Sequence, residues 1–187
     1  MIKNYLKLFL IILMITAQAP LDLVIDTNER DVEIQPGISG TKIVLFGATP
    51  SGNRDIIIEV VGPPKNQTMQ EKRSYFGFWL GRGKSYYKNV PSYYNLLSSK
   101  PLYEITTQES LNKLGLGIEH LPLGKAEIKY STIKQIKFDQ RLRSEMFKNG
   151  QFLEKEENIV LRSGPGKVGL FKTEFSLPPN SLQGRYF

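Results

Sequence analysis

The chain has 187 residues, a formal net charge of +7, one His and no Cys. Without Cys there is no disulfide framework, thiol nucleophile or cysteine-ligated metal site, and one His cannot supply a His-rich metal cluster. We therefore predict neither a metal nor any other cofactor. The length suits one domain with its own hydrophobic core, but these numbers do not indicate a biochemical activity.

The first nineteen residues have the pattern of a secretory signal peptide. Lys3 and Lys7 come before or at the start of the apolar run 8–15, and small residues at positions 17 and 19 stand at cleavage spacing. The run is about half of the roughly 20 residues that a membrane-spanning helix needs, which makes a permanent anchor the weaker interpretation. We predict that residues 1–19 direct export and that residues 20–187 form the exported domain.

Several segments after the leader alternate polar and apolar residues with a period of two, which is typical of strands. Residues 31–35, 55–60 and 171–177 follow this pattern. Residues 42–46 are apolar after the first position, as expected for a strand covered on both faces. Residues 184–187 resemble the opening of one more strand, so we predict that the last strand is incomplete.

Two helices are predicted in the middle of the chain. Residues 107–114 place two leucines on one face and stop at a glycine, whereas residues 132–148 carry an apolar residue at every fourth position from Phe138 and stop at Asn-Gly. We therefore predict a mainly β fold, an immunoglobulin-like β-sandwich with a two-helix insertion near residues 104–150.

Aromatic residues are concentrated between residues 75 and 103, which hold nine of the chain's twenty. We favour the interpretation that they fill the gap between two sheets. A groove for a ligand or partner is one alternative, and a site for single-stranded nucleic acid is another, because Lys and Arg lie nearby. An exported protein meets little intracellular nucleic acid, so we predict no nucleic-acid partner. The default explanation of the positive charge is a solvated basic face, and a surface that faces anionic lipid headgroups or an acidic partner is the functional alternative.

Two short patterns bear on catalysis and phosphate binding. Gly77, Gly81 and Gly83 could suggest a phosphate-binding loop, because residues 81–85 end like one, but Phe78 stands where that loop requires a glycine. We therefore predict a hairpin turn in this glycine-containing segment. His120 has one adjacent acid, Glu119, and the sequence indicates neither a nucleophile nor an orienting partner. We predict that the protein is not an enzyme, and carboxylates converging on His120 in a pocket would favour the opposite conclusion.

Five blocks of sequence resemble, in order, a family of alphaproteobacterial transmembrane proteins: residues 41–48, 55–63, 72–80, 90–102 and 175–186. The resemblance covers nearly all of residues 20–187. It implies a signal peptide, an exported domain and a C-terminal membrane helix that would follow Phe187 and is absent from this chain. The family implies no activity, but its genes tend to lie near sulfite-exporter-type permeases, which suggests an accessory role.

We predict a contact surface from residues that match this family's most recognisable blocks, or lie beside them, and combine aromatic area with cationic donors: Lys72, Arg73, Trp79, Tyr93, Tyr94 and Lys100. The predicted function is a non-enzymatic accessory or interaction module for a membrane-protein partner, on the periplasmic side of the bacterial inner membrane. The sequence indicates no oligomeric state.

The alternative prediction is a periplasmic ligand-binding domain that stacks sugars or cell-wall fragments on an aromatic groove. If the protein is an interaction module, we expect Trp79 and several Tyr residues to be buried between sheets, with basic residues on an exposed rim. If it is a ligand-binding domain, we expect Trp79 to be exposed along the wall of a groove.

Overall fold

The computed structural model describes residues 23–32, 40–50, 54–126, 132–164 and 168–187. The predicted signal peptide lies outside these residues, as does most of the strand predicted over residues 31–35. The described part of the chain is mainly β, with three sheets and three helices. The predicted fold class is confirmed at this level.

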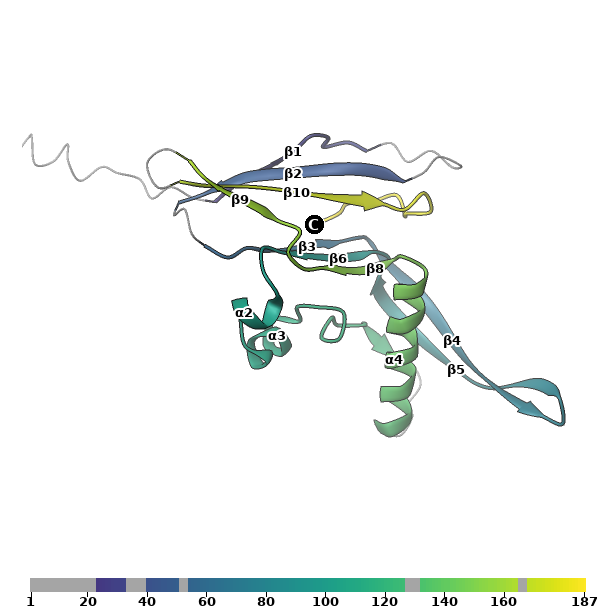
Figure 1. Ribbon diagram of the computed structural model, residues 1–187. Helices are drawn as coiled ribbons and strands as arrows, with labels where there is room; N and C mark the ends of the chain where they lie inside the picture. The colour runs from purple at the N-terminus through teal and green to yellow at the C-terminus, as the bar shows by residue number, and fades with distance from the viewer. Residues whose placement is uncertain (1–22, 33–39, 51–53, 127–131, 165–167) are drawn as a thin grey trace, which may run out of the picture.

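The first sheet forms one outer layer of the molecule and is antiparallel throughout (Figure 1). Its strands, in spatial order, are β1 (Val24–Thr27), β2 (Thr41–Thr49), β10 (Gly169–Leu177) and β9 (Val160–Ser163). In β10 every second residue is buried, which confirms the predicted strand over residues 171–177. In β2, Ile43 and Leu45 are buried but Phe46 is 43% exposed. The prediction that residues 42–46 are covered on both faces is therefore wrong, because an outer layer presents one face to solvent.

The second sheet is the central layer. It consists of β3 (Ile57–Val61), β6 (Tyr94–Ser98) and β8 (Phe152–Lys155). β6 pairs antiparallel with β3 and parallel with β8, and every residue of β6 is buried. Because successive side chains of a strand point to opposite faces, β6 contributes to a core on each side of the sheet.

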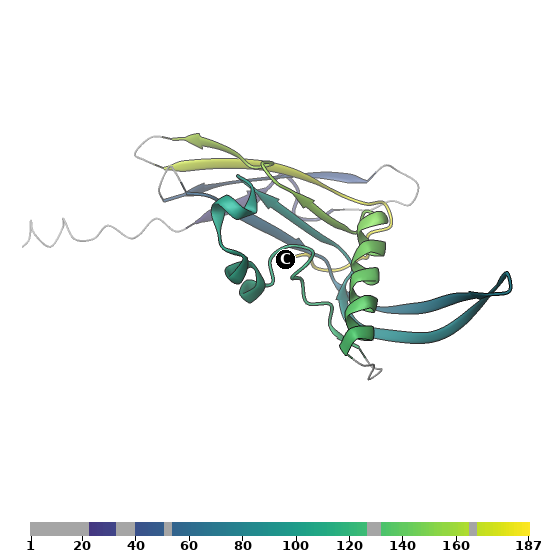
Figure 2. The same cartoon turned by 60° about the horizontal axis from the view of Figure 1, so that its bottom comes forward.

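The helices cover the face of the central sheet that lies opposite the first sheet (Figures 1 and 2). They are α2 (Leu102–Ile105), α3 (Gln108–Leu114) and α4 (Thr132–Lys148). α3 begins after Thr107, whose Oγ1 accepts a hydrogen bond from the backbone N–H of Ser110, and it ends at Gly115 in the left-handed conformation. The helices predicted over residues 107–114 and 132–148 are both confirmed, the first to within one residue.

Two hydrophobic cores result, one on each side of the central sheet. The sheet core lies between the two stacked sheets and contains Ile43, Leu45, Val60, Tyr93, Leu97, Ile159, Phe171, Phe175 and Leu177. The helix core lies between the central sheet, the helices and the base of the third sheet, and its largest members include Tyr87, Tyr94, Phe138, Leu142 and Phe152. The central sheet is thus the element that both cores share.

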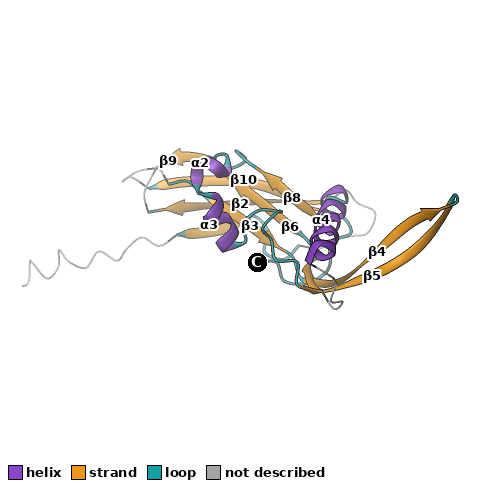
Figure 3. Ribbon diagram, turned by 90° about the horizontal axis from the view of Figure 1, so that it is seen from below, coloured by secondary structure: helices purple, strands orange, loops and turns teal. Residues whose placement is uncertain are grey.

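The third sheet leaves the body as a long hairpin. β4 (Pro64–Tyr75) pairs antiparallel with β5 (Phe78–Pro91), and the short β7 (Lys125–Ala126) pairs with the base of β5. Two views show the far half of this β4–β5 hairpin projecting beyond the other layers (Figures 1 and 3). Its turn lies at Phe76 and Gly77, which confirms a hairpin turn in the segment of Gly77, Gly81 and Gly83, although residues 81–85 lie within β5.

The two stacked sheets and the helical segment follow the predicted architecture in outline. The parallel pair formed by β6 and β8 departs from the all-antiparallel sheets of an immunoglobulin domain. At the end of the chain, Phe187 and Val61 exchange two backbone hydrogen bonds of 2.9 and 3.0 Å. The residues predicted to open a further strand therefore lie along the edge of β3.

Candidate functional site

The structure buries the two tyrosines of the predicted contact surface. Tyr93 is 1% exposed in the sheet core, where its Oη donates to the carbonyl of Ser176 at 3.0 Å, and burial raises its pKa to about 12. Tyr94 is fully buried in the helix core. As neighbours in the central sheet they face opposite cores, so neither offers a surface to a partner and this part of the prediction is wrong.

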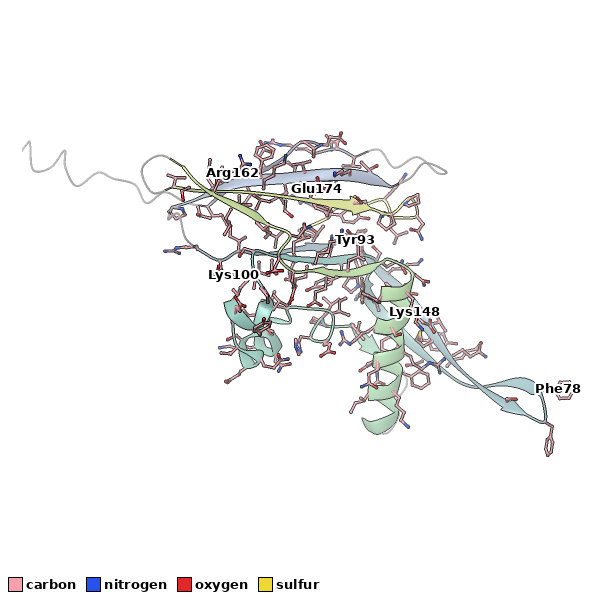
Figure 4. All side chains as sticks on the ribbon, in the orientation of Figure 1. Phe78, Tyr93, Lys100, Lys148, Arg162 and Glu174 are labelled. Carbon is pink, nitrogen blue, oxygen red and sulfur yellow. The ribbon has the colours of Figure 1, made fainter. Side chains whose placement is uncertain are left out.

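The other four residues of the predicted contact surface lie on two separate parts of the molecule. Lys100 follows β6, is exposed, and pairs with Asp55 at 3.0 Å between Nζ and Oδ1. Lys72, Arg73 and Trp79 lie on the strands of the β4–β5 hairpin near its turn. Figure 4 shows Lys100 in the body of the molecule, far from Phe78, the residue before Trp79, at the end of the hairpin. The fold does not bring the six predicted residues together.

The base of the β4–β5 hairpin is held firmly to the body. Tyr87 on β5 is buried, and its Oη donates to Oδ1 of Asp139 on α4 at 2.6 Å. Gln135 of the same helix donates from Nε2 to both of these oxygens, at 3.2 and 2.8 Å. Burial and the adjacent carboxylate raise the pKa of Tyr87, which stays protonated and keeps its role as donor. Met69 on β4 joins the same helix core.

The far end of the hairpin carries exposed aromatic side chains. Phe76 is 102% exposed and Phe78 is 74% exposed. Phe76 and Gly77 both have positive φ, +47° and +83°, between the paired residues Tyr75 and Phe78, which is the geometry of a type I′ turn. Asn, Asp or Gly is preferred at the first central position of that turn, and a bulky residue there is a conformational outlier. The backbone at Phe76 is therefore strained for a residue of this type.

Basic residues accompany these aromatic residues along both strands of the hairpin. Residues 64–91 contain a single acid, Glu71, and six basic residues: Lys65, Lys72, Arg73, Arg82, Lys84 and Lys88. Lys65, Lys84 and Lys88 are exposed. The hairpin therefore carries a formal net charge of +5 out of the chain's +7, and four of its basic residues, Lys72, Arg73, Arg82 and Lys84, lie on the distal half.

A concave surface lies beside α2 and α3, apart from the hairpin. It is an open cleft of about 480 Å³. Leucines and Ile118 form its apolar part, and its polar part includes Gln108, His120, Glu119, Glu154 and Glu156. Tyr103, which is 77% exposed, lies on its wall.

The polar groups of the cleft are engaged in holding the backbone. Glu154 accepts a hydrogen bond from the N–H of Ile118 at 3.2 Å, and Glu156 accepts one from the N–H of Leu102 at 3.0 Å. Gln108 Nε2 lies 2.8 Å from His120 Nε2. His120 thus shares a cleft with carboxylates, as an enzyme would require, but its hydrogen-bonding partner is an amide, and two of the carboxylates fix loop geometry. Within the described residues these groups form no metal-binding cluster.

A buried hydrogen-bond chain connects this cleft to the central sheet. Tyr94 Oη donates to Oε1 of Glu59 on β3 at 2.5 Å and accepts the backbone N–H of Gly117 at 2.8 Å. Burial raises the pKa of Glu59, and the hydrogen bond from Tyr94 opposes that rise. The loop that lines the cleft is therefore tied to the central sheet by the Tyr94 hydroxyl as well as by Glu154 on β8.

The raised pKa of Glu59 predicts a specific dependence of stability on pH. Between the ordinary value of 4.5 and the raised value, the folded state binds more protons at Glu59 than the unfolded state does. The contribution of this group to the free energy of unfolding therefore falls as pH rises through that window. We expect Glu59→Gln to gain stability relative to the wild type as pH increases above 4.5, measured by urea unfolding at a series of pH values. A difference that does not change with pH would contradict this assignment.

The tip of the hairpin is the feature that sequence reasoning missed. The signal present in the sequence was the Phe-Gly-Phe segment at residues 76–78, with aromatic residues on both sides. Phe-Gly supplies the glycine of a type I′ turn, but not the Asn or Asp by which such turns are usually recognised. The aromatic cluster was therefore assigned to the core, which is correct for Tyr87, Tyr93 and Tyr94 alone among the described tyrosines of this segment.

Comparison with known proteins gives a family match over almost the whole chain. A model of the family described as putative transmembrane protein (Alph_Pro_TM) matches residues 22–187. The match confirms the resemblance found in the five sequence blocks. Neither a curated protein nor a solved structure matches. Among the helices of the described residues, none is both long and apolar enough to cross a membrane.

Proposed function

The chain belongs to the alphaproteobacterial family Alph_Pro_TM, and from this premise we propose that it is a non-enzymatic accessory module for a membrane-protein partner. Its working surface is the β4–β5 hairpin. The module acts at the periplasmic side of the inner membrane, where the predicted signal peptide over residues 1–19 delivers it. A sulfite-exporter-type permease is the partner class that the gene neighbourhood of the family favours.

One observation carries this proposal: the hairpin leaves the body and ends in exposed aromatic side chains. An exposed apolar group at the end of a projection adds nothing to the packing of its own domain. The base of the same hairpin is fixed by the bonds from Tyr87 and Gln135 to Asp139 on α4. A rigid base and an exposed end are the properties of an element that reaches toward another molecule.

Photo-crosslinking in cells tests this proposal. A photoreactive amino acid replaces Gln70, an exposed residue on the flank of the hairpin, and in a matched variant it replaces Gln140, an exposed residue on α4. In an alphaproteobacterial host, we expect position 70 to give an adduct with a membrane protein and position 140 to give none. Protease treatment of spheroplasts should degrade the protein. An absence of adducts at position 70, or protection from the protease, would argue against the proposal.

A ligand-binding role is the second candidate, and the cleft beside α2 and α3 favours it. Tyr103 gives this cleft an exposed aromatic side chain. A sugar ring stacks on an exposed aromatic face, and the polar groups around Tyr103 are suited to its hydroxyls. If cell-wall fragments bind, Tyr103→Ala should abolish binding, whereas replacement of residues 71–83 by Asn-Gly should not. The immunoglobulin-like relationship stays a prediction, supported by the two stacked sheets and opposed by the parallel pair.

A further inference from the structure

We infer that the tip of the β4–β5 hairpin inserts into the interfacial region of a bilayer that contains anionic lipids. Phe76 and Phe78 enter the boundary between headgroups and acyl chains, and the basic residues behind them meet the lipid phosphates. This inference rests on the proposed function, because that function places the chain at a membrane surface. It goes further in naming the lipid, rather than a protein, as the molecule that the tip contacts.

Backbone strain at the tip indicates that Phe76 is there for a purpose other than folding. A bulky residue with φ of +47° is less stable than Asn or Gly would be at the same place. No folding gain offsets this cost, since the side chain is 102% exposed and buries no area against its own domain. Strain that persists at an exposed position is characteristic of binding sites.

The reach of the hairpin suits contact with a surface that lies beyond the body. Among the hairpin residues whose burial is described, the buried pair farthest along the strands is Met69 with Ser85, and the turn begins at Phe76, seven residues after Met69. At about 3.3 Å per residue the tip stands roughly 20 Å past that pair. Figure 3 shows this distal half projecting beyond the helices and the other sheets. The tip is therefore able to enter a bilayer while the body stays in water.

The size of the tip favours lipid over protein as its partner. An aromatic side chain buries about 150–250 Å², so Phe76 and Phe78 together offer about 400 Å². A stable protein interface needs about 800 Å² from each partner. A bilayer sets no such requirement on contact area, because its interior accepts any apolar side chain that reaches it.

The composition around the tip matches a membrane interface. Tyr75 and Trp79 flank the two Phe residues in sequence, and Tyr and Trp are enriched where membranes meet water. Each Lys or Arg near an anionic bilayer contributes about 1 kcal/mol. Of the six basic residues in this stretch, Lys72, Arg73, Arg82 and Lys84 lie on the distal half of the hairpin, whereas Lys65 and Lys88 lie at its base. Apolar insertion and electrostatic attraction therefore act at the same end of the molecule.

The chain's single tryptophan makes the inference testable without a label. Trp79 lies on β5 three residues after Phe76, so its fluorescence reports on the tip and not on the rest of the chain. The full-length chain is mixed with vesicles of phosphatidylglycerol and phosphatidylethanolamine, or of phosphatidylcholine alone. On the anionic vesicles we expect the emission of Trp79 to shift to shorter wavelength and to be quenched by lipids brominated near the headgroup. High salt should weaken this response.

Two variants separate tip insertion from other modes of binding. The double variant Phe76→Asn with Phe78→Ser should lower the partition coefficient at least about tenfold. Its thermal stability should be unchanged or higher, because Asn suits the turn. Phe147→Ser removes a side chain of 55% exposure from α4 and serves as the matched control, with no expected effect. The leader is present in every variant, so its own affinity for lipid cancels.

Three results would overturn the inference. In the first, the chain sediments with vesicles while the emission of Trp79 neither shifts nor is quenched. In the second, the double variant responds like the wild type. In the third, the response requires vesicles that contain membrane proteins, which would assign the tip to a protein partner. The crosslinking from position 70 tests the proposed function separately, because an adduct in cells does not depend on the response of Trp79 to pure lipid.

Discussion

Phe152→Ala is expected to lower the free energy of unfolding by about 3–5 kcal/mol. Phe152 opens β8, is fully buried in the helix core, and packs edge to face against Tyr94 with ring centroids 6.1 Å apart. Its removal leaves a cavity beside the central sheet. Because that sheet contributes residues to both cores, the residues around the cavity have little freedom to collapse into it. Urea unfolding followed by circular dichroism measures the change.

Phe78→Ala is the matched control for that experiment. The same side chain is removed, but Phe78 is 74% exposed at the hairpin tip and packs against no core. We expect the unfolding free energy to change by no more than about 0.5 kcal/mol. If Phe152→Ala were as mild as Phe78→Ala, the placement of β8 within the central sheet would be wrong.

The sequence predicts best the elements that have one buried face. α4 was predicted with its observed bounds, because its apolar residues recur every four positions and an Asn-Gly pair ends it. β10 was predicted because its buried and exposed residues alternate strictly along nine residues. In both cases a single element, seen alone, shows which of its faces is inside.

Elements whose environment depends on distant segments could not be predicted in this way. β6 has no alternation to detect, since the first sheet covers one of its faces and the helices cover the other. Tyr93 and Tyr94 are adjacent residues that face different cores, so an aromatic pair that suggested a contact surface is structural. Only the stacking of the first sheet, the central sheet and the helices shows that these tyrosines are buried in the cores rather than exposed on a contact surface.

The candidate site was hidden for a related reason. The aromatic residues between positions 75 and 103 divide into a buried group that includes Tyr87 and an exposed group that includes Phe76 and Phe78. The register of the β4–β5 hairpin decides this division, and the register depends on a two-residue turn that has Phe in place of the usual Asn. Phe76, the residue that makes the turn hard to recognise, is therefore also the exposed residue that we propose enters the bilayer.

Tyr94→Phe is expected to destabilise the protein by about 1–3 kcal/mol, because it leaves the backbone N–H of Gly117 and the carboxylate of Glu59 without their shared partner. The change keeps the aromatic ring and removes only the hydroxyl. Because that hydroxyl lowers the pKa of Glu59, its loss should raise this pKa further and steepen the decline of stability with rising pH. Urea unfolding at several pH values measures both effects, and hydrogen exchange at Gly117 should become faster.

A double-mutant cycle separates the hydrogen bond from the general cost of altering a buried tyrosine. If Tyr94 and Glu59 act as a pair, Tyr94→Phe combined with Glu59→Gln should depart from additivity by about 0.5–3 kcal/mol. Tyr103→Phe removes a hydroxyl from an exposed tyrosine of the same cleft and should change stability by no more than about 0.5 kcal/mol. Strict additivity would mean that the two groups stabilise the sheet independently. The cleft loop would then be held to the sheet by two bonds that do not involve Glu59: the bond from Gly117 to Tyr94 and the bond that Glu154 accepts from Ile118. Non-additivity would show that Tyr94 and Glu59 stabilise the protein through their shared hydrogen bond.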